Sequence, residues 1–288
     1  MDVASDAVEP GGAPAARIQP GVRWAHRGWQ ISLWLGLAIA FSPVLLELAE
    51  HGEAQPWARV SLVFPVLVWI AARRDTVRPG PAAWGWGLVA GGIMLELIVI
   101  GGDVVRLGRL GLAGAAIGLC FAGGWTSLRV ALLFLWSIPL PAAILNRFGP
   151  ELASVVMGFG AQVASRFGLA VVGFPTSLES AGTSLAVLPS DCGLQTAFVL
   201  AGFGCFRGIW LRATVPGIRR QAVIGACFAA PLHLILAIAA ALALGLGSPP
   251  ETIRTGLDDF SWLGVSVLAL AGVFWPSHTA RAGSESSS

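Results

Sequence analysis

The chain has no lysine and no tyrosine, and charged residues of all kinds make up only 12% of its 288 positions. A soluble domain carries about 25% charged residues, so the composition argues against a soluble globular protein. All 18 basic residues are arginine, the formal net charge is +2, and no long run of basic residues occurs. The sequence therefore gives no indication of a nucleic-acid partner.

Cysteine is also scarce. The four cysteines, Cys120, Cys192, Cys205 and Cys227, have no CxxC spacing, and three of them lie inside apolar runs. This pattern predicts neither a disulfide framework nor a zinc site. No phosphate-binding loop or dinucleotide fingerprint is convincing, so we expect neither a cofactor nor a metal.

Apolar residues fill the chain instead: 55% are hydrophobic and the mean hydropathy is +0.74. A membrane-spanning helix needs about 20 apolar residues. We expect an all-α integral membrane protein with about eight transmembrane helices, whose partner is the lipid bilayer. The expected spans are residues 29–49, 58–72, 82–101, 107–124, 128–145, 192–210, 221–246 and 261–276.

The distribution of arginine predicts the orientation of these spans. With eight of them, twelve of the 18 arginines fall on the side of the N-terminus and six on the other side. Because arginine accumulates in cytoplasmic loops, we expect both termini in the cytoplasm and the spans in the inner (plasma) membrane. Residues 29–276 form the expected membrane domain. Residues 1–28 and 277–288 are predicted to be disordered cytoplasmic tails.

The longest segment between predicted spans covers residues 146–191, on the outer side. Its first part, 151–172, is apolar but interrupted by polar side chains, which predicts an amphipathic surface helix or a partly re-entrant one. Its second part, 173–190, mixes Gly, Pro, Ser and Thr with Val and Leu. That composition predicts an extended segment or a small hairpin over the outer mouth of the bundle.

Three side chains could perform chemistry, and each has a plainer interpretation. Cys192 lies at the predicted start of a helix, where the partial positive charge favours a thiolate; it could also be a small residue in a tight turn. His233 is an intramembrane ionisable residue, usually functional, or a neutral histidine bonded inside the bundle. Asp258 could orient His233, or Asp258 and Asp259 could cap a helix N-terminus.

Together, Cys192, His233 and Asp258 contain the parts of a thiol acyl-transfer site, in which the base lowers the thiol pKa and the acid fixes the tautomer of the base. Asp191, Gln195 and Asp259 are the predicted substrate-binding residues beside them. Depth is the difficulty, because His233 lies near the middle of its apolar run while Cys192 lies near the surface. A kink at Pro231 or a recessed Cys192 is needed to bring them together.

Three stretches of the chain resemble the exosortase/archaeosortase family. They are Trp136–Pro141 (WSIPLP), Cys192–Gln195 (CGLQ) and Asp258–Trp262 (DDFSW), which are similar to a Pro-x-Pro break, a nucleophile segment and the entry to the last span. The resemblance implies a polytopic membrane cysteine peptidase or transpeptidase. Its expected partners are exported proteins with a C-terminal transmembrane sorting signal, cleaved on the extracytoplasmic side.

The catalytic set implied by the resemblance is altered in this chain. Without a gap, the family nucleophile falls on Asp191 and the family arginine on His233. The family histidine falls on Leu257, or on Asp258 with one deletion. Two interpretations follow: the site has moved to Cys192, His233 and Asp258, or catalysis has been lost and the protein is a membrane scaffold or assembly factor. A transporter is a third option, disfavoured because paired intramembrane charges are lacking.

Overall fold

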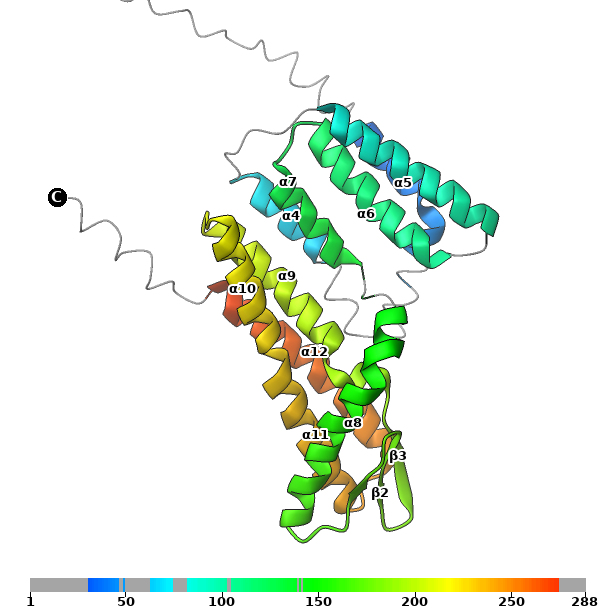
Figure 1. Cartoon of the computed structure of the whole chain (residues 1–288), viewed down its shortest axis with the longest axis vertical. Coiled ribbons are helices and arrows are strands. Elements are labelled where there is room, and N and C mark those ends of the chain that lie inside the picture. Colours follow the sequence, from blue (N-terminus) through cyan, green and yellow to red (C-terminus); the bar gives the residue numbers. More distant parts are fainter. Residues whose placement is uncertain are drawn as a thin grey trace, which may run out of the picture.

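A computed structural model describes residues 31–46, 49, 63–74, 82–102, 105–138, 140 and 142–274. The predicted tails, 1–28 and 277–288, lie outside the described residues. The described chain is mostly helical, with one small sheet (Figure 1). Its labelled elements are α4 (Phe64–Ala72), α5 (Ala82–Gly102), α6 (Val105–Ala122), α7 (Leu128–Ala131), η1 (Leu132–Ser137), α8 (Ala142–Arg166), β1 (Val172–Gly173), β2 (Ser177–Ser180), β3 (Thr183–Ala186), η2 (Pro189–Cys192), α9 (Leu194–Trp210), α10 (Val215–Cys227), α11 (Ala229–Gly245) and α12 (Pro250–Phe274).

Three described helical segments are long and apolar enough to cross a membrane. They cover Ala82–Val99, Val215–Gly245 and Pro250–Val273, and in an apolar 18-residue stretch of each only 22%, 33% and 17% of the residues are buried. Apolar side chains that face outward on such helices, Ile98, Ile235 and Leu270 among them, are more than half exposed. Exposed apolar side chains are stable in lipid. The helices can carry them there because each helix satisfies its own backbone polar groups. The chain is therefore a largely helical membrane protein.

The helix boundaries differ from the predicted spans in three places. The predicted span 128–145 is broken, since α7 and η1 end at Ser137 and α8 begins at Ala142. The span 221–246 is two nearly collinear helices, α10 and α11, which begin earlier, at Val215. The last helix begins at Pro250 and not near residue 261. The remaining predicted spans stay predictions where they run into undescribed residues.

The predicted extended segment at residues 173–190 is confirmed as a small antiparallel sheet. Strand β2 pairs with β1 on one side and with β3 on the other, in the order β1-β2-β3. Gly182 supplies a positive φ of 84° at the turn between β2 and β3. Leu178 and Leu185 face each other across the two strands, and both are buried against α8 and α11. The predicted helix over 151–172 is α8, which begins nine residues earlier and ends at Arg166, so that Val172 belongs to β1. Helix α8 packs along α11.

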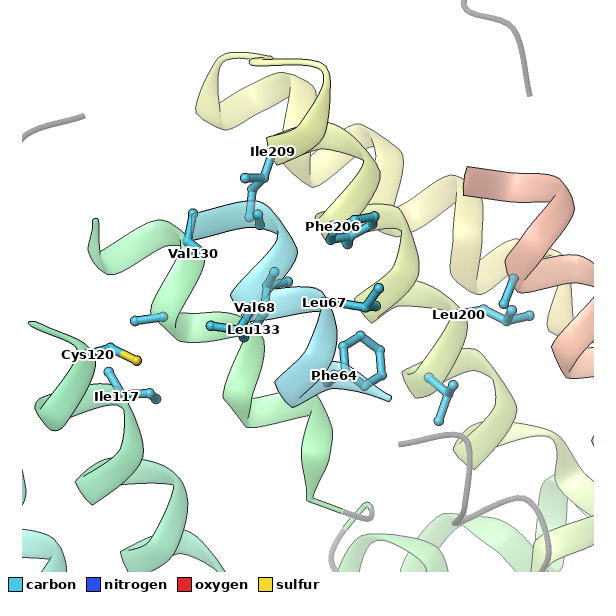
Figure 2. Close-up of a cluster of buried hydrophobic side chains, with 14 of the residues drawn as sticks. Phe64, Leu67, Val68, Ile117, Cys120, Val130, Leu133, Leu200, Phe206 and Ile209 are labelled. Atoms are coloured by element: carbon cyan, nitrogen blue, oxygen red, sulfur yellow. The ribbon is translucent and has the colours of Figure 1, made fainter. Parts of the chain in front are cut away.

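Two groups of helices meet at an apolar core. Figure 2 shows this core, where Phe64, Leu67 and Val68 from α4 lie between η1 and α9. Leu200 and Phe206 from α9 complete it, and Val265 brings in α12. A second core joins α8, α11 and the sheet at the opposite end of the molecule. The site described below lies between these two cores.

The described acidic residues are concentrated at one end of the molecule and the arginines mainly at the other. Apart from Glu96 in α5, the described acidic residues belong to α8, the sheet, η2 and the first half of α12, at the end that carries the strands in Figure 1. The other end, where α4 finishes and α9 turns into α10, is rich in arginine. Its members are Arg73, Arg74, Arg129, Arg207, Arg212, Arg219 and Arg220.

Helices α9 and α10 touch through their backbones. A Cβ atom added to Gly204 would lie 2.9 Å from Ala222 Cα and closer still to the Gln221 carbonyl. We expect Gly204→Leu to destabilise the protein by about 1–3 kcal/mol through overpacking, measured as a lower thermal unfolding midpoint in detergent. The matched control is Gly91→Leu, since a Cβ at Gly91 meets nothing within 4 Å. Equal midpoints for the two variants would contradict this packing.

Candidate functional site

The carboxylate of Asp191 anchors the segment that contains Cys192. Its Oδ1 accepts a hydrogen bond from Arg254 Nη1 at 2.8 Å, and its Oδ2 accepts from Arg254 Nη2 at 3.1 Å. The backbone N–H of Leu188 donates to Oδ2 at 2.8 Å. Only 9% of the Asp191 side chain and 21% of the Arg254 side chain are exposed. A two-point Arg–carboxylate pair fixes orientation as well as distance, so η2 is tied to the first turn of α12.

The same arginine also holds the sheet. Arg254 Nη2 donates to the backbone oxygen of Ala186, the last residue of β3. One guanidinium therefore joins α12, β3 and η2. Asp191, predicted to bind substrate, has its carboxylate committed to Arg254 and Leu188. Sequence reasoning missed Arg254 because 63 residues separate it from Asp191, and no local pattern signals such a pair.

His233 is bonded through both ring nitrogens. Its Nδ1 lies 3.1 Å from the backbone oxygen of Asp191, and its Nε2 lies 2.9 Å from Thr196 Oγ1. A carbonyl oxygen only accepts, so Nδ1 carries the proton. In the neutral imidazole Nε2 is then the acceptor, and the Thr196 hydroxyl donates to it. Thr196 was not predicted, although a polar residue inside the apolar run 192–210 is a signal that could have found it.

Gly193 brings η2 up to the imidazole. It has a φ of 78°, a value that favours glycine, and it is the N-cap residue directly before α9. A Cβ atom at this position would lie 2.8 Å from His233 Cδ2. Asp191 and Gly193, on either side of Cys192, therefore both lie against His233. The Cys192 side chain does not line the cavity that His233 lines, and its sulfur bonds the Leu194 N–H. The convergence of the Cys192 thiol with His233 and Asp258 stays a prediction.

The environment of Cys192 does not favour a thiolate. Its Sγ accepts a hydrogen bond from the Leu194 N–H at 3.4 Å, and the side chain is half-buried. Burial raises the pKa of the Cys192 thiol, and the negative charge of Asp191 raises it further, whereas the Leu194 amide lowers it. The net direction is upward, so the expectation that a helix N-terminus would lower the pKa of this thiol is wrong. Desolvation outweighs the helix terminus.

Asp258 shares a small cavity with His233. The cavity has a volume of about 30 Å³ and is lined by Met157, Ser190, Asp191, His233, Leu236, Ala237, Leu257, Asp258 and Ser261. A space of this size with several polar groups suits about one water molecule. The group that bonds His233 Nδ1 is the Asp191 carbonyl, so the expected orienting role of Asp258 is filled by backbone.

Asp258 and Asp259 do not cap a helix N-terminus, because α12 begins eight residues earlier, at Pro250. Asp259 is exposed on the outside of α12. Gln195, another predicted substrate-binding residue, is only 3% exposed. Its Oε1 accepts from the backbone N–H of Leu140 at 3.1 Å, which ties α9 to the break between η1 and α8. Within the described residues, Gln195 Nε2 has no hydrogen-bond partner.

Metal ligands are not clustered in the described ranges: no group of three or more His, Cys, Asp or Glu side chains could hold an ion there. All four cysteines are free thiols. A scan against protein-family models, a search of the curated proteins and a search of the solved structures each found no match.

Removing the guanidinium tests the anchor. We expect Arg254→Gln to cost about 3–5 kcal/mol, because it leaves the Asp191 carboxylate desolvated without its cation. Arg254→Lys should recover only part of the lost stability, since an ammonium is a point charge and cannot span both carboxylate oxygens. Thermal unfolding of the purified protein measures both. Arg166→Gln, at an exposed position at the end of α8, is the control, and a wild-type midpoint for Arg254→Gln would refute the anchor.

Alkylation kinetics test the Cys192 thiol. In a variant in which the other three cysteines are alanine, we expect Cys192 to react with iodoacetamide more slowly at pH 7.5 than a free thiol in solution. The rate should still rise above pH 9, because the raised pKa keeps the thiol protonated below that value and only the thiolate reacts. A rate that levels off below pH 8 would show a lowered pKa instead.

Proposed function

We propose that this chain is an exosortase-like membrane protein that processes C-terminal sorting signals of exported proteins on the extracytoplasmic side. The observation that supports the proposal is that the three stretches carrying the resemblance lie together, although they are far apart in sequence. Gln195 of the second stretch bonds Leu140 of the first. Asp258 of the third lines a cavity with Asp191, the residue that directly precedes the second stretch.

The lengths of the helices support an extracytoplasmic site. At 1.5 Å per residue, His233 lies about 20 Å along the α10–α11 segment from Arg220, about two thirds of the roughly 30 Å thickness of the hydrocarbon core. With the arginine-rich end in the cytoplasm, His233 lies in the outer half of the membrane, and the sheet lies toward the outer side. This arrangement suits eight spans in the inner membrane with both termini in the cytoplasm.

Cys192 is the proposed nucleophile. Its sulfur bonds to the carbonyl carbon of the scissile peptide, the C–N bond breaks, and the leaving nitrogen takes up a proton. Water or an acceptor amine then releases the acyl group from the sulfur. His233 is the proposed base, and its Nε2 must first exchange the Thr196 hydroxyl for the thiol. Substrate binding therefore has to rearrange Cys192 or Thr196 before the reaction begins.

A second candidate, a catalytically inactive exosortase homologue that serves as a scaffold or assembly factor, is favoured by one observation. The hydrogen bonds of His233 go to Asp191 and Thr196, and the pKa of Cys192 is raised. In that protein, Asp191, Arg254 and His233 form a structural core that holds the sheet against the bundle. Binding of a sorting signal without cleavage is then its function.

The two candidates differ in a processing assay. For the enzyme, Cys192→Ala and Cys192→Ser abolish cleavage of an exported reporter with a C-terminal span and basic tail, while Cys227→Ala leaves cleavage intact. Both variants should reach the membrane in wild-type amounts, because Cys192 contributes little to packing. Immunoblotting of the reporter in the native host measures the result. Cleavage that persists in Cys192→Ala rules out the proposal of a Cys192-dependent enzyme. If the wild-type protein does not cleave the reporter but co-purifies with it, the protein is the scaffold.

A further inference from the structure

An apolar groove lies on the arginine-rich half of the molecule. It has a volume of about 620 Å³, between the helical residues 31–40, α4 and the segment that joins α6 to η1. It is open toward the outside of the bundle, since Ile31 and Trp69 on its walls are 68% and 56% exposed. Its lining is Ile31, Trp34, Pro65, Val68, Trp69, Ala72, Arg73, Cys120, Trp125, Thr126 and Phe134.

The groove continues toward the other end of the bundle. A second hollow of about 240 Å³ shares Trp34, Pro65 and Phe134 with the first. Its other lining residues are almost all aliphatic, from residues 37–45, α6 and the end of η1. The two hollows adjoin at the three shared residues and are together called the channel. A shape of this kind accommodates a hydrocarbon chain, because apolar walls offer it contacts equal to those in lipid.

Positive charge is concentrated at one end of the channel. Arg73 is the charged residue in its lining, and its guanidinium carbon lies 3.6 Å from the centre of the Trp69 ring. Arg74 stacks on Trp210 in the same way at 3.5 Å, and it lines a separate small cavity against α9 together with Arg129 and Arg212. A guanidinium that stacks through its face still presents N–H groups at its edge, which match a phosphate.

The charge decides between two membrane occupants. A sorting signal ends in a basic tail, which the arginines would repel. An anionic phospholipid places its phosphate among them while an acyl chain enters the channel, as basic pockets between membrane helices commonly bind acidic lipid head groups. No acidic side chain lines the channel or the small cavity beside Arg74 in the described part of the chain. We propose that this channel is a binding site for an anionic phospholipid, with Arg73 holding the phosphate.

Lipid retention tests the proposal on the full-length protein. The protein is purified in detergent with equal amounts of dioleoyl phosphatidylglycerol and dioleoyl phosphatidylcholine, and retained lipid is counted by mass spectrometry. We expect the wild-type protein to retain phosphatidylglycerol preferentially, and Arg73→Gln to reduce that preference about fivefold. Ala72→Phe, which fills the groove, should lower retention of the lipid. Arg166→Gln, at the opposite end, should leave the preference unchanged.

Three results would overturn the site. Equal retention of the two lipids by the wild-type protein would mean that charge does not select the occupant, and this result does not depend on any variant folding. Displacement of phosphatidylglycerol by a synthetic helix with a basic tail, at the same concentration at which a helix with an acidic tail fails, would assign the channel to a protein segment. Glycerophosphoglycerol, which lacks acyl chains, should not compete; if it did, the channel would have no part in binding.

Discussion

The two-point pair between Asp191 and Arg254 is the contact on which the candidate site depends. It fixes the position of η2, and through η2 it fixes the carbonyl that sets the tautomer of His233 and the turn that places Cys192. The same guanidinium holds the end of β3. A pair with this little exposure has to offset the desolvation of two ions, so its complete set of hydrogen bonds is a condition for its stability.

The polar centre of the molecule is organised by backbone as much as by side chains. The Asp191 carboxylate accepts hydrogen bonds from Arg254, and the Asp191 backbone carbonyl accepts one from His233. Gly193 has no side chain, which leaves room for the His233 ring. Thr196 then completes the hydrogen bonds of the imidazole. This network leaves Cys192 bonded to a backbone amide and half-buried. Whether the protein is an enzyme or a scaffold therefore depends on how a bound substrate changes these contacts.

Composition and apolar periodicity predicted the membrane class, the small sheet and the start of α9 to within two residues, because each follows from local preferences. The start of α12 was missed, although Pro250 at the first helical turn and Glu251 beside it are ordinary helix-start signals. The polar residues before residue 261 interrupt the apolar run from which the last span was predicted. The partners of His233 and Asp191 were beyond sequence reasoning, since they depend on residues 37 to 63 positions away. The sequence did predict that the η2 segment, α11 and α12 meet.

The link between Asp191 and Arg254 also has a consequence for biogenesis. Arg254 belongs to the last described helix. During translation, η2, Thr196 and His233 are therefore synthesised well before the Arg254 guanidinium that holds η2 in place. Until α12 emerges and inserts, the carboxylate of Asp191 has no guanidinium and the sheet has no anchor. Assembly of the polar centre therefore requires that α12 has been translated and inserted.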